Sequence, residues 1–428
     1  MKESALNTHT LQAIAQNASS NAWTAFNGAN TKGKLASILC LDDFEARARA
    51  YLPKALYGYI AGSVETRQSW KDNFNAFEQW GFVPRVLKNV ARRSQSTALF
   101  KHEWDCPFGI APMGIAALST YDGDQVMARA AAQANIPFIL SGSSLTRLES
   151  IMEVAPNSWF QAYLPGEQQR INGLIARVKA AGVKTLVITV DIPVAGNREN
   201  NIRAGFSTPL RPSPRLVWDG LTHPRWLLGT FLRTLMNGIP HFENSFAERG
   251  APIISRNVER DFSNREHLDW RHIEKIREQW PGHLIIKGIL NAQDAALAKA
   301  KGADGIIISN HGGRQLDGAV SPLRVLPDII QATDNLPVML DGGIRRGSDV
   351  LKALALGAKF VFLGRPFNFA AATASQDGVN HAIALLKAEI DRNMAMLGVN
   401  QPEELGEAFL MRLYCECRGR YQRIGYCR

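Results

Sequence analysis

Cysteine is scarce in this chain of 428 residues, and long apolar runs are missing. The five cysteines are odd in number and scattered, which is typical of reduced thiols and not of a disulfide framework. Cys415 and Cys417 are too close together for a zinc site and have no second pair, so we expect no metal. There is no run of about 18 apolar residues and no signal-peptide core. These absences predict a cytoplasmic protein without a membrane-spanning segment.

Motifs of nucleic-acid-binding proteins are also missing. The formal charge is +10, and part of it lies in the tail after Leu413, where arginines far outnumber the single acid Glu416. No zinc-finger spacing and no RNA-binding motif accompanies this charge, so we expect no nucleic-acid partner. The remaining candidates for a basic protein are an anionic small molecule and an anionic membrane surface. With 46% apolar and 21% charged residues, the composition is that of a globular protein.

The first 40 residues contain no arginine and show weak periodicity, which argues against a transit peptide. We expect residues 1–40 to be a mobile extension, in which residues 11–25 are the candidate for a short helix. Asp42, Asp43 and Glu45 are typical of the first turn of a helix. We expect one domain over residues 41–405 and a basic tail over residues 406–428.

Short apolar runs alternate with alanine-rich helical patterns along most of the chain. Eight runs are strand candidates: 108–112, 137–141, 159–163, 185–190, 284–287, 305–309, 337–340 and 360–363. Strand and helix alternating eight times predict a parallel sheet closed into a barrel. A doubly wound sheet is the alternative, but no early glycine-rich phosphate turn supports it. The prediction is an α/β protein: a (β/α)8 TIM barrel with an N-terminal helical extension and a long insertion after strand 4.

That insertion, residues 207–270, is far longer than an ordinary loop between strand and helix. Within it, apolar residues recur at helical spacing and arginines accompany them. Such a segment either lies in a membrane interface or packs on its own barrel or another subunit. The apolar residues are Trp226, Leu227, Leu228, Phe231, Leu232, Leu235 and Met236, and the arginines are Arg211, Arg215, Arg225 and Arg233.

Polar residues gather where the predicted barrel strands end, which is the edge that carries active sites in this fold. His311, after the sixth strand, can take a proton near neutral pH, and Asp191, after the fourth, can orient its imidazole. Arg198 and Arg314 offer planar forks for a carboxylate. Lys287, ending the fifth strand, favours developing negative charge. Together they predict a catalytic site for an acidic small molecule.

Two glycine-rich stretches follow the seventh and eighth strands. Residues 341–346 read Asp-Gly-Gly-Ile-Arg-Arg, and Gly364 is followed by Arg365. Glycines expose backbone N–H groups, and a phosphate site commonly lies in these two loops of the barrel. They predict a phosphate-binding site.

Residues 309–317, Ser-Asn-His-Gly-Gly-Arg-Gln-Leu-Asp, resemble the active-site signature of the FMN-dependent 2-hydroxy acid oxidases and dehydrogenases, a family that includes glycolate oxidase, L-lactate dehydrogenase and mandelate dehydrogenase. The resemblance extends over about residues 41–405. Further matching motifs appear in the expected order: Leu-Pro-Lys at 52–54, Tyr-Gly-Tyr at 57–59, Ala-Pro-Met-Gly at 111–114, Thr-Val-Asp at 189–191 and Lys-Gly at 287–288.

The resemblance implies FMN as cofactor and assigns a role to each matching residue. His311 is implied as the base and Asp191 as its partner. Hydride transfer to the flavin and removal of the α-proton both remain open as mechanisms. Substrate contacts are implied for Tyr59, Tyr163, Arg198 and Arg314. FMN contacts are implied for Pro112, Met113, Gly114, Ser141, Gln161, Thr189, Lys287, Ser309, Asp341, Gly342, Gly343, Ile344, Arg345, Gly364 and Arg365.

The family resemblance also bears on the electron acceptor. Gly114 stands where the family's dehydrogenases tend to have Gly and its oxidases Ala. Membrane-associated lactate and mandelate dehydrogenases carry their anchoring insertion at the place of residues 207–270. We therefore expect an L-2-hydroxy acid dehydrogenase, lactate-like substrates favoured, that passes electrons to quinone or a cytochrome at the cytoplasmic face of the inner membrane. The alternative is an oxidase that makes hydrogen peroxide from O2. A homo-oligomer, a tetramer by resemblance, is expected.

Overall fold

The computed structural model describes residues 33, 35–207, 211, 213–255 and 265–413. The predicted helix at residues 11–25, most of the predicted extension and Cys415, Cys417 and Cys427 lie outside these ranges.

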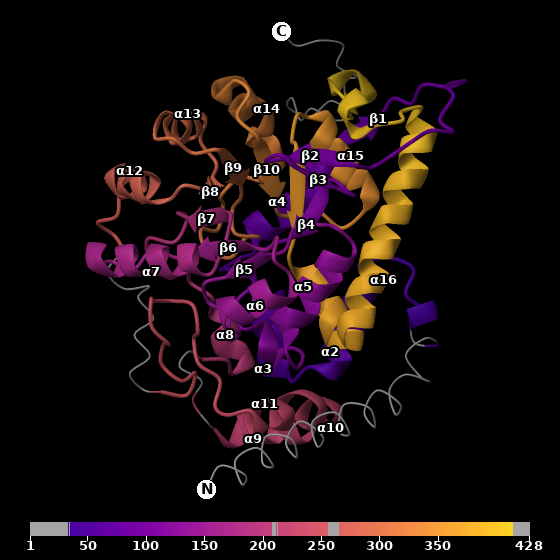
Figure 1. The fold of residues 1–428 in the computed structure, drawn as a ribbon. Coiled ribbons are helices and arrows are strands. Elements are labelled where there is room, and N and C mark those ends of the chain that lie inside the picture. The colour runs from indigo at the N-terminus through magenta and orange to yellow at the C-terminus, as the bar shows by residue number, and fades with distance from the viewer. Residues whose placement is uncertain (1–32, 34, 208–210, 212, 256–264, 414–428) are drawn as a thin grey trace, which may run out of the picture.

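Eight parallel strands form the centre of the molecule (Figure 1), and each overlaps one of the predicted runs. The sheet begins with β4 and ends with β5, and a parallel bridge between Ile110 and Phe138 joins these two ends. The bridge closes the sheet and confirms the barrel over the doubly wound alternative. The strands are β4 (Phe108–Ile110), β5 (Ile139–Ser141), β6 (Trp159–Ala162), β7 (Thr185–Thr189), β8 (His283–Ile289), β9 (Gly305–Ile308), β10 (Val338–Asp341) and β11 (Phe360–Leu363).

A helix follows each strand and covers the outside of the barrel. The strands are rich in β-branched and aromatic residues buried on both faces, as a sheet between two apolar layers requires. The helices are α5 (Gly123–Gln133), α6 (Leu148–Val154), α7 (Gln168–Ala180), α12 (Trp270–Gln279), α13 (Ala292–Ala300), α14 (Pro322–Thr333), α15 (Gly347–Ala355) and α16 (Arg365–Leu397).

The barrel interior is a separate apolar core. Val187, Ile285 and Phe360 belong to it, and Leu99 and Trp104 pack against the same cluster. Leu99 and Trp104 come from a hairpin of β2 (Thr97–Leu99) and β3 (His102–Trp104). Because side chains fill the barrel, ligands can bind only at its ends.

Three helices before the barrel brace the loops at its carboxyl edge. They are α2 (Asp43–Tyr51), α3 (Lys54–Ala61) and α4 (Gln68–Glu78). The expected acidic first turn of α2 is confirmed, because Asp43 and Glu45 lie in it. Asp43 also accepts hydrogen bonds from the N–H groups of Leu39 and Cys40, which precede the helix. On α4, Asp72 pairs with Arg324, and the side-chain amides of Asn73 and Asn310 bond each other in both directions.

The insertion forms short helices at the lower margin of Figure 1. They are α9 (Pro214–Leu221), α10 (Pro224–Trp226), a π-helical turn η2 (Leu227–Leu232) and α11 (Arg233–Met236), preceded by α8 (Glu199–Ala204). Trp226 Nε1 donates to the carbonyl of Leu118 at 2.8 Å, and the hydroxyls of Tyr51 and Thr230 lie 2.7 Å apart. These bonds attach the insertion to α2 and to the loop after β4.

Part of the segment expected to be a tail is paired in the structure. After η3 (Pro402–Glu404) and η4 (Glu407–Phe409), strand β12 (Leu410–Arg412) runs antiparallel to β1 (Trp80–Phe82). Residues 414–428 lie outside the described chain. Among the residues described, no helix is long and apolar enough to cross a membrane.

Candidate active site

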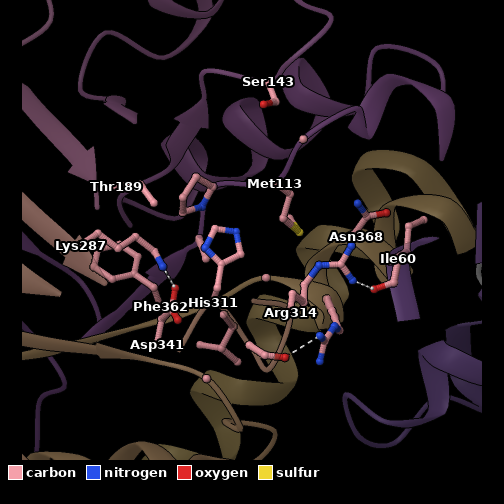
Figure 2. A pocket seen from close by; sticks show the side chains of 18 of the residues that line it. Ile60, Met113, Ser143, Thr189, Lys287, His311, Arg314, Asp341, Phe362 and Asn368 are labelled. Atoms are coloured by element: carbon pink, nitrogen blue, oxygen red, sulfur yellow. Dashed lines mark hydrogen bonds and ion pairs between the residues drawn. The ribbon is translucent and has the colours of Figure 1, made fainter. Parts of the chain in front are cut away.

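One cavity at the carboxyl edge of the barrel gathers most of the predicted site residues (Figure 2). Four others, Asp191, Ser141, Gln161 and Ser309, do not line the cavity wall. The predicted residues on the wall are Tyr59, Pro112, Met113, Gly114, Tyr163, Thr189, Lys287, Arg198, His311, Arg314, Asp341, Gly342, Gly343, Ile344, Arg345, Gly364 and Arg365.

His311 and Asp191 form a buried pair. The imidazole Nδ1 lies 2.9 Å from Asp191 Oδ1, which leaves Nε2 as the nitrogen available to a substrate. Burial lowers the pKa of His311 below its usual value, and the charge of Asp191 offsets only part of that effect. The imidazole is therefore neutral near pH 7 and can accept a proton. Gly288 permits the approach, because a Cβ there would lie 2.7 Å from Asp191 Cβ.

Lys287 is buried, and in the view of Figure 2 it lies on the side of the cavity away from Arg314. Its Nζ lies 2.8 Å from Asp341 Oδ2 and 2.8 Å from Ser309 Oγ. Lys287 lies on β8 and Asp341 on β10, and Ser309 directly follows β9, the strand between them, so all three meet at one edge. The carboxylate stabilises a cation that burial alone would destabilise.

Arg314 is held by backbone carbonyls and an aromatic ring. Its Nη1 donates to Gly62 O at 2.6 Å and to Ile60 O at 3.2 Å, and its Cζ lies 5.1 Å from the centre of the Tyr59 ring. Burial, with Arg198 nearby, lowers the pKa of Arg314 to about 10. Arg198 donates to the Arg314 carbonyl at 3.2 Å, so it holds the loop as well as lining the cavity.

A second cationic cluster lies where the phosphate site was predicted. Burial and then Arg314 and Arg345 hold the pKa of Arg365 well below its usual value. An anion between these guanidinium groups would relieve both the burial and the repulsion. Gly343 has φ of +85°, and a Cβ there would lie 2.1 Å from the Asn73 carbonyl, so only glycine allows α4 to approach this loop.

Buried polar atoms without partners, on the cavity wall and behind it, indicate what the cavity holds. Gln161 Nε2, Thr189 Oγ1 and Asp191 Oδ2 are buried without a hydrogen-bond partner. Buried polar groups are normally paired, so these atoms point to a ligand that supplies the missing partners. Donors and acceptors beside a cation at one end, and guanidinium groups beside glycine loops at the other, fit a polar ring system with a phosphate tail.

Two residues near the cavity escaped the sequence analysis. Asn368, in the first turns of α16, lines the cavity, and its Oδ1 is buried without a partner. Arg265, from the insertion, places its Cζ 5.3 Å from the centre of the Tyr163 ring, and the Tyr163 ring centre lies 6.5 Å from that of His311. Asn368 lies in the unbroken alanine-rich pattern of a helix, and Arg265 lies in a stretch without periodicity, so neither carried a signal.

Comparison with known proteins agrees with this geometry. A family model described as FMN-dependent dehydrogenase matches residues 48–412. The chain belongs to this family. FMN is accordingly its cofactor, and the protein is an oxidoreductase.

Curated relatives and solved structures of the family match nearly the whole barrel. (S)-Mandelate dehydrogenase of Pseudomonas putida is 38% identical over 378 residues, covering 87% of this chain and 94% of that protein. L-lactate dehydrogenase of Pseudomonas entomophila is also 38% identical over 378 residues, covering 86% and 97%. The crystal structure of the monotopic membrane protein (S)-mandelate dehydrogenase superposes with a TM-score of 0.81 at 35% identity, covering 88% of this chain and all of that one.

Proposed function

We propose that this protein oxidises an L-2-hydroxy acid to the 2-oxo acid, with lactate-like acids as the favoured substrates. The observation that carries the proposal is the placement of a neutral base, His311 paired with Asp191, in the same cavity as the buried Arg314. A 2-hydroxy acid presents a carboxylate next to an oxidisable carbon, so it needs one cation and one base at short range. The named lactate and mandelate dehydrogenases among the relatives support this class.

Each side chain then has a defined task. Arg314 holds the substrate carboxylate. The carbonyls of Ile60 and Gly62 fix the plane of the Arg314 guanidinium group. His311 takes a proton from the substrate at Nε2, and Asp191 stabilises the imidazolium that results. Tyr59 and Tyr163 line the substrate side of the cavity. FMN, when bound, would supply the acceptor for the two electrons that leave the substrate carbon.

The remaining polar groups of the cavity would hold the cofactor. Gln161 and Thr189 would pair their orphaned atoms with the flavin ring, and Lys287 would stabilise negative charge on its reduced form. Arg345, Arg365 and the glycine loops after β10 and β11 would hold the phosphate. Heat-released cofactor should run as FMN on chromatography, and recovery of FAD would contradict this arrangement.

Anaerobic mixing tests the reaction directly. The purified FMN-loaded protein is mixed with L-lactate, L-mandelate, glycolate and their D-enantiomers where these exist, and the flavin absorbance is followed. We expect bleaching by an L-2-hydroxy acid and none by the matching amide, because an amide cannot pair with Arg314. Equal bleaching by acid and amide would contradict the carboxylate role of Arg314.

We further propose that the reduced enzyme passes its electrons to quinone or a cytochrome at the cytoplasmic face of a membrane. In the structure, the predicted apolar stripe of the insertion is partly buried and partly exposed. Trp226 is 7% exposed and packs inward, whereas Leu228 is 58% and Met236 86% exposed. Trp218 on α9 is 69% exposed, so α9–α11 together present an apolar surface. Contiguous exposed apolar side chains of this kind mark interaction sites.

Arginines surround this surface, which suits an anionic bilayer. Arg211, Arg215 and Arg225 are exposed around this apolar surface. Each can contribute about 1 kcal/mol to the free energy of binding to an anionic membrane. The monotopic (S)-mandelate dehydrogenase structure supports the same interpretation. Reoxidation of the reduced protein by a quinone, compared with air, tests the acceptor: faster reoxidation by O2 would favour the oxidase alternative.

We also propose that the protein is a homo-oligomer. Val86 and Leu87, which follow β1, are 79% and 102% exposed, and a second copy would cover them. Light scattering of the purified protein gives the stoichiometry, for which a tetramer is expected and a monomer would contradict the proposal.

A further inference from the structure

A single buried hydroxyl connects the two halves of the site. Ser309 follows β9 and is fully buried. Its Oγ lies 2.8 Å from Lys287 Nζ, 2.6 Å from Asp341 Oδ1 and 2.9 Å from the backbone nitrogen of His311. The resemblance of the sequence implies a cofactor contact for Ser309, but these distances indicate a different task.

The directions of the three hydrogen bonds are determined by the partners. An ammonium group and a backbone N–H can only donate, so the hydroxyl accepts from Lys287 and from His311. Its own hydrogen must then go to Asp341, whose ionised carboxylate can only accept. One hydrogen and two lone pairs are all that a hydroxyl has, so Ser309 Oγ has no capacity left for a cofactor.

The bond to His311 supports an unusual backbone. His311 has φ of +56°, in the left-handed region that side chains other than glycine seldom adopt. A serine hydroxyl that accepts from the N–H two residues later stabilises a tight turn locally. The same turn aims the imidazole at Asp191. The hydroxyl therefore fixes the base on one side and the cavity-lining cation, Lys287, on the other.

We propose that Ser309 is a positioning residue that sets the place of Lys287 and of His311 together, so that the cofactor's electron affinity and proton removal depend on one hydroxyl. The proposal rests on the proposed function for the part that concerns His311. Without the hydroxyl, Lys287 keeps only Asp341 as a partner, so its ammonium group is no longer held in one position. The His311 N–H loses its acceptor, and the turn relaxes.

The test uses Ser309→Ala in the FMN-loaded protein, with two independent readouts. The first is the dissociation constant of sulfite, which adds to flavins more tightly when a cation lies beside the ring; it needs no substrate. The second is the rate constant of anaerobic flavin reduction, separated from the dissociation constant of the hydroxy acid. We expect sulfite binding to weaken about tenfold and reduction to slow about tenfold or more, the scale of one hydrogen bond to a charged group. Substrate binding should change little, because Arg314 lies outside the network.

Three further variants control the result. Ser309→Thr keeps the hydroxyl and should restore both readouts. Ser309→Cys places a weak acceptor of similar size at this position, so both readouts should fall between those of the wild type and the alanine variant. If the alanine variant does not fold, the cysteine variant replaces it in the test. Ser321→Ala removes another fully buried serine of the same loop, one whose Oγ has no partner, and should move neither readout.

The outcomes separate the two claims. If sulfite binding weakens but no 2-hydroxy acid reduces the flavin of the wild type, the proposed function fails, while the link to Lys287 stands. If Ser309→Ala moves one readout and leaves the other at the wild-type value, the joint positioning role is wrong. If only FMN retention changes, Ser309 is a plain cofactor contact.

Discussion

The carboxyl edge of the barrel and the insertion helices α9–α11 place their side chains in opposite ways. At the barrel edge, charged groups are buried: Lys287 is 3% exposed. On α9 and α11, large apolar groups are exposed, as Trp218 and Met236 show. Both arrangements cost free energy in an isolated chain. Each arrangement is therefore evidence for a partner. The buried cations at the barrel edge indicate an anionic small molecule, and the exposed apolar side chains of the insertion indicate an apolar surface. If the two regions serve different partners, substitutions in one should leave the other's function intact.

The largest effect is expected from His311→Ala. Loss of the base should slow flavin reduction by the substrate by about 10²–10⁴-fold, the usual contribution of a general base. FMN should stay bound, and sedimentation with membranes should not change. Stopped-flow absorbance under anaerobic conditions measures the rate. Reduction within a few-fold of the wild type would remove His311 from its role.

Arg314→Lys should have the next largest effect. An ammonium cannot make the bidentate pair with a carboxylate, and it also loses the contacts with the carbonyls of Ile60 and Gly62. We expect kcat/KM for the acid to fall by about 10- to 100-fold. The matched control is Arg324→Lys, at an arginine that pairs with Asp72 away from the cavity. An equal loss in both variants would mean a general loss of stability.

The double variant Trp218→Ser with Met236→Ser should weaken binding to anionic vesicles by about tenfold or more, because each side chain contributes on the order of 1–3 kcal/mol when buried. Reduction of the flavin by substrate should not change. Met396→Ser is the control, since Met396 is 66% exposed on α16 but lies outside the insertion. Point substitutions test this surface more cleanly than deletion, because Trp226 and Thr230 of the same segment pack against the body. Wild-type protein that never binds vesicles at low salt would end the membrane proposal.

The smallest effect concerns pH. Because burial puts the pKa of His311 below its usual value near 6.5, the reduction rate should hold down to pH values below 6.5 before it falls. In Asp191→Asn the carboxylate that stabilises the imidazolium is gone, so the pKa of His311 drops further. The acid limb of the profile should move to lower pH, while the plateau rate falls about tenfold. An acid limb that moves upward would contradict the assigned pair.

The barrel could be predicted well because the patterns that indicate its strands and helices lie within short stretches of the sequence. Each strand is a short apolar run, and residues that end parallel strands must meet at one edge, which is why His311, Lys287 and Asp341 converge as expected. The cavity wall confirms their proximity, while their individual roles stay predictions. The stripe of the insertion was predicted less well. Helical spacing assumes a regular α-helix, but residues Leu227–Leu232 form a π-helical turn, which changes the face each residue occupies. Trp226, just before this turn, packs inward, whereas Leu228 within it is exposed.

Long-range contacts carried no local signal. The pairing of β12 with β1 joins segments far apart in the chain, and neither is a strong apolar run. Arg265 reaches Tyr163 only because the insertion folds back over the barrel edge. Such contacts depend on tertiary packing, which spacing along the chain does not encode.

The bridge that closes the barrel has a consequence for the local motions of the cavity wall. Five pairs of residues join β7 and β8. In the described chain, β4 is joined to the segment before β5 by the bridge between Ile110 and Phe138, and we call this junction the seam. Amide hydrogens along this seam should therefore exchange with solvent faster than those of β7 and β8. The loop after β4 carries Met113 and Gly114, and the loop after β5 carries Ser143, all on the cavity wall. Small openings at the seam would widen the cavity beside these residues, so we expect the mobility of this seam to influence how large a side chain a substrate can carry.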